Sequence, residues 1–126
     1  MAKTVIHTDA APGAIGAYSQ GIKSEGMVYA SGQIGLDPAT GTLREGVEAQ
    51  ARQAFSNLSA ILAAGGTTLE SAVKISIFLA VINDFAVVNK VMQELVPEPF
   101  PARSCFAVAA LPKGALVEVE AIAEIP

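Results

Sequence analysis

The chain has 126 residues, the size of one domain, and 52% of them are hydrophobic while 16% are charged. Its formal charge of −4, with only eight scattered lysines and arginines, lacks the basic footprint typical of nucleic-acid binding. No apolar run approaches the roughly 18 residues of a membrane span. Residues 1–126 are therefore expected to form a single globular domain that has neither nucleic acid nor a membrane as a partner.

The first half of the chain predicts three short strands and one long helix. Strands are expected over 3–7, 20–24 and 27–33, with a loop over 9–18 and a hairpin turn at Glu25 and Gly26. Residues 37–41 form a turn. A helix over about 46–64 follows and ends at Gly65 and Gly66. Its apolar stripe is made of Val47, Ala51, Ala54, Leu58 and Ile61, whereas Gln50, Arg52, Gln53 and Asn57 lie off the stripe.

The second half predicts a strand, a helix and a final pair of strands. The β-branched run over 72–82 is typical of a central strand buried on both faces. Asn83 and Asp84 are candidate N-caps of a helix that ends before Pro97. Its apolar stripe consists of Phe85, Val88, Met92 and Leu95. The last two strands, over 102–109 and 116–125, are expected to join through residues 111–114.

This order of elements favours a two-layer α+β fold. The economical arrangement is a mixed sheet with both helices packed on one face. Other subunits would then cover the second face, and the apolar excess of so short a chain also predicts a homo-oligomer.

The few cysteines and histidines exclude several kinds of site. One cysteine cannot form an internal disulfide, and one cysteine with one histidine does not make a zinc site, so we expect no metal. The first residues lack the apolar centre of a signal peptide. A reduced, cytoplasmic compartment is the expectation that follows.

Arg103 is the most informative residue of the chain, because it lies in an otherwise apolar strand. An unpaired buried charge is costly, so the guanidinium needs a partner from the protein or from a ligand. Side chains alternate along a strand, so Arg103 and Cys105 project from one face, and Ser104 and Phe106 from the other.

The last strand carries Glu118, Glu120 and Glu124 on one face. If the loop before it has an even number of residues, the hairpin places Arg103 and Cys105 on the face of Glu118 and Glu120. Two interpretations stay open at this point. Arg103 pairs with one of these glutamates as ordinary sheet chemistry while Cys105 is a small buried hydrophobe, or the three groups form a site. A Cys–His hydrolase is disfavoured, because the only histidine is in another strand.

Five segments, in order along the chain, resemble the Rid (YjgF/L-PSP) family of reactive-intermediate deaminases, in its imine/enamine deaminase A type. The first three are residues 15–20, residues 31–34 on the third strand, and residues 50–54 in the long helix. The fourth is 83–85 with Asn89, and the fifth is 100–105 followed by 117–121. Each segment alone is a weak signal, but together they cover nearly the whole chain.

The resemblance implies a chorismate-mutase-like homotrimer with sites between subunits. It also implies hydrolysis of 2-imino acids and their enamine tautomers, such as 2-aminoacrylate and 2-iminobutyrate, to 2-keto acids and ammonia, without a cofactor. Arg103 would hold the substrate carboxylate through two parallel hydrogen bonds, and Glu118 would activate water. The other positions that match the family's substrate contacts are Tyr18, Ser31, Gly32, Asn89 and Cys105.

Other interpretations remain beside this one. A non-catalytic sensor or holdase trimer would keep Arg103 as a carboxylate receptor without needing Glu118. An endoribonuclease or translation inhibitor is disfavoured by the acidic charge and the single histidine. Three of the residues also have an interpretation without a role in the site. Tyr18 could cap a loop, Asn89 could be a polar residue that faces solvent, and Gly32 could be a glycine at a bulge. Glu120 is the alternative to Glu118 as the water-activating carboxylate.

Overall fold

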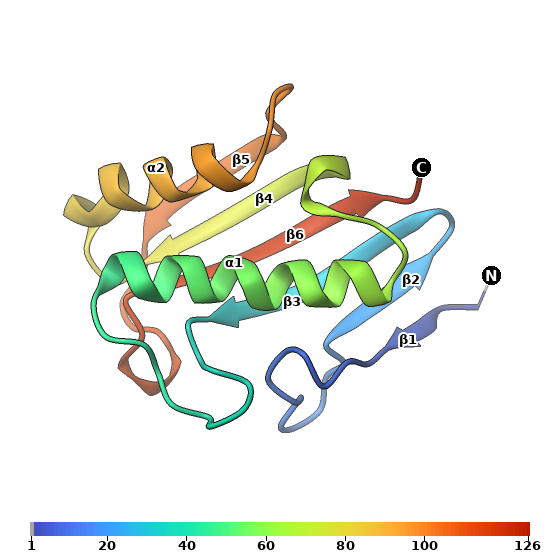
Figure 1. Ribbon diagram of the computed structural model, residues 1–126, viewed down its shortest axis with the longest axis horizontal. Helices are drawn as coiled ribbons and strands as arrows, with labels where there is room; N and C mark the ends of the chain where they lie inside the picture. Colours follow the sequence, from blue (N-terminus) through green and yellow to red (C-terminus); the bar gives the residue numbers. More distant parts are fainter. Residues whose placement is uncertain (1) are drawn as a thin grey trace.

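A six-stranded mixed sheet forms one layer of the protein. The computed structural model describes residues 2–126, and the strand order is β1-β2-β3-β6-β4-β5 (Figure 1). Neighbouring strands are antiparallel except β4 and β5, which are parallel. The strands are β1 (Thr4–Ile6), β2 (Gly21–Ser24), β3 (Met27–Ile34), β4 (Ala72–Leu79), β5 (Ala102–Ala107) and β6 (Val117–Glu124).

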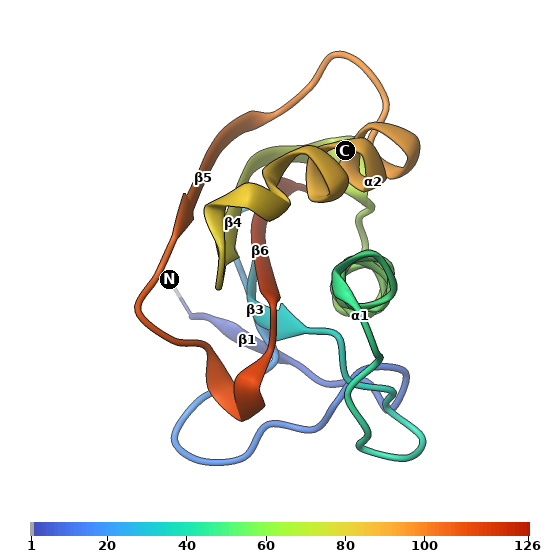
Figure 2. The same ribbon diagram turned by 90° about the vertical axis from the view of Figure 1, so that its left-hand side faces the viewer.

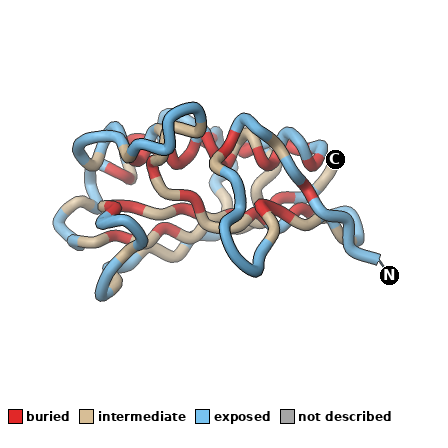
Figure 3. Tube along the Cα trace, turned by 90° about the horizontal axis from the view of Figure 1, so that it is seen from below, coloured by how far each residue is buried: buried red, intermediate tan, exposed pale blue. Residues whose placement is uncertain are grey.

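Helices α1 (Val47–Ala64) and α2 (Phe85–Leu95) form the second layer, and both lie on the same face of the sheet (Figure 2). Short 3-10 turns complete the chain at η1 (Leu69–Ser71), η2 (Ile82–Asp84) and η3 (Pro112–Gly114). Buried residues concentrate between the two layers (Figure 3). The predicted two-layer α+β fold is confirmed. No helix within residues 2–126 combines the length and the apolar character that crossing a bilayer requires.

The long helix forms where its apolar period predicts, and its stripe packs on β3 and β6. Two polar residues off the stripe, Gln50 and Asn57, are nevertheless buried. Their side chains are satisfied by backbone groups: Gln50 accepts from the Leu116 N–H at 2.8 Å, and Asn57 donates to the Leu36 carbonyl at 2.9 Å. These bonds fasten α1 to the loops at the ends of β3 and β6. Asp84 is at the N-cap of α2, but its side chain makes no capping hydrogen bond.

The prediction that the last two strands pair directly is wrong. After β4 the chain crosses over through α2 and returns as β5, parallel to β4 at the edge of the sheet. Strand β6 instead inserts between β3 and β4. The connection through a helix explains the parallel pair, since parallel strands need a crossover whereas a hairpin gives only antiparallel neighbours.

The prediction that Arg103 lies on the same face of the sheet as Glu118 and Glu120 is therefore also wrong. Directly paired residues point to the same face, and Arg103 is paired with Ile75, which is buried under the helices. Glu118 is paired with Phe78, which points to the opposite face. Within one chain, Arg103 and Cys105 project towards the helix layer, while Glu118 and Glu120 project away from it.

The sheet face away from the helices is covered by no element of residues 2–126 (Figure 2). It exposes apolar side chains, with 44% of Tyr29 and 48% of Phe106 accessible to solvent. Phe106 packs edge to face on Phe78, with ring centroids 5.3 Å apart. Strand β4 has Ile77 buried and Phe78 half-buried, so this strand is not buried on both faces as predicted.

Candidate functional site

One cluster of predicted site residues surrounds Glu118 at the start of β6. Here a cavity of about 460 Å³, termed the glutamate pocket, is lined by Tyr18, Gly32 and Glu118 together with Pro12, Ile15, Lys113 and neighbouring residues. Gly32 is in β3 next to a break in the pairing with β6 between Ala30 and Gln33. The sheet therefore brings three residues together that are far apart in the sequence.

Gly32 and the Glu118 carboxylate make a very close approach. A Cβ built on Gly32 would collide with Glu118 Oε2, because real Cβ atoms do not approach a heavy atom so closely. Gly32 also lies beside the predicted irregularity of β3, so both the bulge and the close contact demand a small residue. The carboxylate occupies the volume that any other side chain would fill.

The environment of Glu118 disfavours its charged form. The side chain is half-buried on a central strand, and Glu120 is two residues along on the same face. Burial, and to a lesser degree the negative charge of Glu120, raise the pKa of the Glu118 carboxyl above its ordinary value. A carboxylate with a raised pKa that faces an open pocket has the properties of a general base for chemistry near neutral pH.

Tyr18 reaches the glutamate pocket from the loop between β1 and β2. Its side chain is 52% exposed, and its phenol oxygen accepts a hydrogen bond from the Ile15 N–H at 3.2 Å. This local bond agrees with the loop-cap alternative, but it leaves the phenolic hydrogen free to bond elsewhere. Both roles are compatible with the geometry.

A second cluster surrounds Arg103 on β5. A cavity of about 330 Å³, termed the arginine pocket, is lined by Asn89, Met92, Gln93, Phe100, Pro101 and Arg103. Nη1 of Arg103 donates to Asn89 Oδ1, and the guanidinium carbon is 5.2 Å from the centre of the Phe85 ring. Asn89 thus holds Arg103 rather than pointing only to solvent.

Arg103 has no carboxylate within salt-bridge distance among residues 2–126. Its two side-chain hydrogen bonds, to Asn89 and to the Met92 sulfur at 3.8 Å, both use Nη1. Within that range, the edge formed by Nε and Nη2 makes no hydrogen bond to protein. That edge has the fork geometry that binds a carboxylate through two parallel hydrogen bonds.

Ser31 and Cys105 line neither pocket. The Ser31 hydroxyl donates to the Ser19 carbonyl at 2.6 Å and so ties β3 to the loop that carries Tyr18. Cys105 is half-buried on β5, and burial raises the pKa of its thiol while the charge of Arg103 opposes that effect. A raised pKa reduces the thiolate fraction, which agrees with Cys105 not being a nucleophile.

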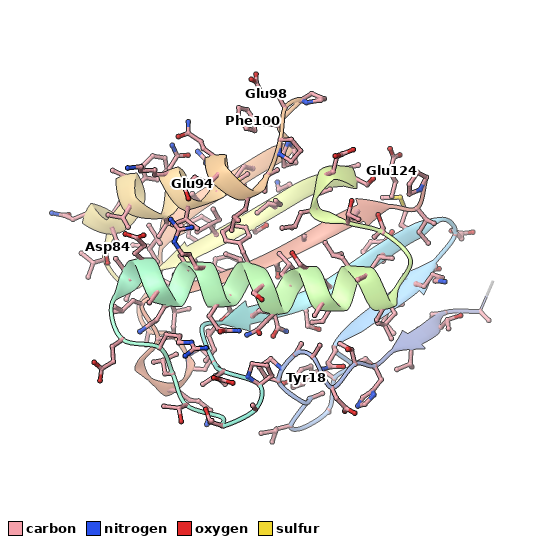
Figure 4. All side chains as sticks on the ribbon, viewed as in Figure 1. Tyr18, Asp84, Glu94, Glu98, Phe100 and Glu124 are labelled. Atoms are coloured by element: carbon pink, nitrogen blue, oxygen red, sulfur yellow. The ribbon has the colours of Figure 1, made fainter. Side chains whose placement is uncertain are left out.

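The two clusters are separated within the chain, since Arg103 is on the edge strand β5 and Glu118 is on the central strand β6. In Figure 4, Tyr18 lies below α1, while Phe100, which lines the arginine pocket, lies beyond α2 at the other edge of the sheet. Together with the opposite orientation of Arg103 and Glu118, this separation means that one small molecule cannot contact both residues within a single chain. The residues that the sequence predicts to form one site are therefore divided between two separate clusters.

Sequence reasoning missed Phe85 as a contact of Arg103, Phe100 as part of the arginine pocket and Lys113 as part of the glutamate pocket. The sequence places Phe85 in the apolar stripe of α2 and in the segment 83–85 that resembles the family, but gives it no contact with Arg103. Its spacing of four from Asn89 places both on one face of the helix, and this spacing is the signal that could have linked it to Arg103.

These features define a class of protein: a small two-layer α+β domain with a guanidinium edge in one pocket and a half-buried carboxylate in another. The family model described as endoribonuclease L-PSP matches residues 8–125, and the chain belongs to this family. A human 2-iminobutanoate/2-iminopropanoate deaminase is 46% identical over 124 residues, covering 98% of this chain and 90% of the relative.

Solved structures agree with this assignment. RidA from the Antarctic bacterium Psychrobacter is 50% identical and superposes with a TM-score of 0.94, covering 97% of this chain and 99% of its own. TdcF from E. coli, solved with bound serine, is 41% identical with a TM-score of 0.90, and the match covers 96% and 98% of the two chains. The resemblance to the Rid family seen in the sequence is confirmed.

Proposed function

We propose that this protein hydrolyses 2-imino acids and their enamine tautomers to 2-keto acids and ammonia. The observation that carries the proposal is the half-buried Glu118 carboxylate, with its raised pKa, lodged against Gly32 and facing a pocket. The names of the relatives support the same reaction, since the human relative is called a 2-iminobutanoate/2-iminopropanoate deaminase.

We also infer that the site is assembled between copies of the chain, as a homotrimer. The Arg103 and Glu118 half-sites face opposite sides of one sheet, so a single substrate meets both only if two subunits contribute. The uncovered sheet face, with Tyr29 and Phe106 exposed, supplies apolar surface for such an association. The number three follows from the resemblance to the Rid family.

In the proposed mechanism, Arg103 binds and orients the substrate. The Nε–Nη2 edge holds the carboxylate in a two-bond fork, while Asn89 and Phe85 keep the guanidinium in place. TdcF with bound serine supports this role, because serine carries its carboxylate and its amino nitrogen on the same carbon, as the proposed imines do. Binding the carboxylate brings the imine carbon of the substrate to the glutamate pocket of the neighbouring subunit.

Glu118 then removes a proton from water as the water oxygen bonds to the imine carbon. The electron pair of the C=N bond moves to nitrogen, which takes the proton from protonated Glu118, and a carbinolamine forms. The Glu118 carboxylate then transfers the hydroxyl proton of the carbinolamine to its nitrogen. The C–N bond breaks with release of ammonia, and the hydroxyl oxygen forms the C=O bond of the keto acid. A positioned base contributes typically 10²–10⁴-fold to such a step.

The direct test is ammonia release from 2-iminobutyrate and 2-iminopropionate generated in situ, with and without the protein. Glu118→Gln should lower kcat by roughly 10²–10⁴-fold while a 2-keto acid still binds in calorimetry. Arg103→Lys should weaken that binding, because a point charge cannot form the fork. Glu124→Gln, an exposed glutamate at the far end of β6, is the matched control.

Two outcomes would contradict the proposal and favour another role for the protein or for Glu118. Wild-type protein that binds keto acids without speeding imine loss would be a carboxylate sensor. Unchanged turnover in Glu118→Gln, with turnover lost in Glu120→Gln, would move the role of base to Glu120. The ribonuclease activity named in the family's description is a weaker candidate, because the chain has a net charge of −4 and a single histidine. That histidine, His7, directly follows β1 and its side chain is exposed.

A further inference from the structure

The loop that carries Tyr18 has no regular structure of its own to hold it. It joins the end of β1 at Ile6 to the start of β2 at Gly21 and provides Pro12, Ile15 and Tyr18 to the glutamate pocket. Much of it is exposed, including 82% of Ile15. A loop of this length needs fixed contacts if it is to present a side chain in one position.

Those contacts come largely from one side chain, Gln20, which is 2% exposed. Its Oε1 accepts the Thr8 N–H at 2.8 Å. Its Nε2 donates to the carbonyls of Pro12 at 2.8 Å and Thr8 at 3.0 Å, with a longer contact to Ala11 at 3.3 Å. The amide of Gln20 therefore uses its acceptor and both of its donor hydrogens on the backbone of this one loop.

The backbone of Gln20 is joined to the other side of the pocket. Its carbonyl accepts the Ser31 N–H at 2.9 Å, and the Ser31 hydroxyl donates to the neighbouring Ser19 carbonyl at 2.6 Å. Ser31 precedes Gly32, against which the Glu118 carboxylate lies. Gln20 thus connects the Tyr18 loop to the segment that sets the position of Glu118.

We propose that Gln20 is a positioning residue of the deaminase site, which acts through the loop to fix Tyr18 relative to Glu118. The inference rests on the proposed function. Without the Gln20 amide, the partly buried backbone groups at Thr8 and Pro12 lose their partners and the loop must move to expose them to water. The hydrogen bonds within the sheet and the helices do not involve this amide, so the fold survives while the loop loses its fixed position. The effect should fall on kcat rather than on KM, because Arg103 still binds the carboxylate.

The first test compares Gln20→Met with Thr67→Val. Methionine has nearly the length of glutamine but no hydrogen-bonding amide. Thr67 is a buried control away from both pockets, where valine keeps the shape and loses one bond to the Glu124 carbonyl. Gln20→Met should lower kcat by roughly 10- to 100-fold, as expected for a small misplacement, with KM changed only a few-fold. Thr67→Val should lower the melting temperature and leave kcat near the wild-type value.

A double-mutant cycle shows whether Gln20 acts through Tyr18. Tyr18→Phe removes the phenol oxygen that the loop positions, so adding Gln20→Met to it should cost clearly less than Gln20→Met costs alone. Full additivity, or a wild-type kcat in Gln20→Met, would overturn the inference.

Gln20→Glu is the second variant, in case Gln20→Met fails to fold. The buried carboxyl keeps the acceptor for the Thr8 N–H and donates only when it is protonated. Its kcat relative to wild type should therefore rise as pH falls, and a ratio that is independent of pH would count against the proposal.

Hydrogen exchange separates this inference from the proposed function. In Gln20→Met, amides of residues 8–18 should exchange faster than in wild type, whereas those of β4 should not. If the amides of residues 8–18 exchange in Gln20→Met as slowly as in wild type, Gln20 is not a positioning residue, whatever the deaminase activity of the variant. Wild-type protein without deaminase activity would overturn the proposed function and the catalytic part of this inference, while faster exchange would still support the fixing of the loop by Gln20.

Discussion

Gly32 shows how a missing side chain positions a reactive group. The Glu118 carboxylate fills the space next to the Gly32 backbone, where any Cβ would collide with Oε2. The contacting atom is the end of a flexible side chain, so a larger residue at position 32 would displace the carboxylate rather than unfold the sheet.

Gly32→Ala should therefore separate activity from stability. The melting temperature should stay close to that of wild type, because the displaced group is a side chain at the surface of a pocket. Turnover of 2-iminobutyrate should fall by roughly 10- to 100-fold, the range for a misplaced reacting group. A variant that keeps wild-type kcat would show that the observed position of Glu118 has no role in turnover.

The charge of Glu120 should tune the base at position 118. Glu118 acts only when it is deprotonated, so activity is lost as pH falls through its pKa, which burial and Glu120 raise. Glu120→Gln removes the repelling charge, lowers that pKa and should shift the acid limb of kcat/KM to lower pH. The plateau at higher pH should stay near that of wild type. An acid limb that stays in place, or moves to higher pH, would contradict this coupling.

At the scale of elements, α1 is positioned by its contact with the chain that leaves β3. A Cβ on Gly35 would be 2.6 Å from both Cα and O of Gln50 in the helix. These are backbone atoms, which cannot rotate away as a side chain does. The bonds of Gln50 to the Arg44 carbonyl and of Asn57 to the Leu36 carbonyl attach the helix to the same segment of the chain.

Gly35→Ala should destabilise the fold, because the helix backbone must move to admit the methyl group. We expect a loss of about 1–3 kcal/mol in the free energy of unfolding, the range for an overpacked core. Gly13→Ala is the control, since a Cβ at Gly13 has no neighbour within 4 Å. Urea denaturation of both variants measures the difference, and equal stability of the two would refute the close contact.

The elements themselves were largely predictable from sequence, whereas the order of the strands was not. The periodic stripe of α1 and the glycines after it define the helix, because both signals are local. Because β5 and β6 follow each other in the chain, the sequence predicts that they pair as a hairpin. In the structure the crossover through α2 instead makes β5 the parallel neighbour of β4. The partner of Arg103 is consequently Asn89 on α2 rather than a glutamate on β6.

The candidate site was predictable only through the family resemblance. Composition and spacing indicated Arg103 and the carboxylates of β6, but nothing local linked Tyr18 or Gly32 to Glu118. Their proximity depends on the loop contacts of Gln20 and on the pairing of β3 with β6, which are long-range features of the fold.

At the scale of the whole molecule, one arrangement accounts for two separate observations. The chain leaves an apolar sheet face open, and it places Arg103 and Glu118 on opposite faces of the sheet. The proposed ring of copies would cover the open faces and bring the arginine pocket of one subunit to the glutamate pocket of the next.

The most direct measurement is complementation between two inactive variants. Arg103→Ala and Glu118→Gln are co-expressed, assembled species with three times the 12.9 kDa chain mass are isolated, and 2-iminobutyrate turnover is measured. In each mixed trimer one site combines an intact Arg103 with an intact Glu118. Random assembly of equal amounts in a closed ring of three should restore about a quarter of wild-type turnover. Mixed trimers that stay as inactive as either variant alone would contradict a site shared between subunits.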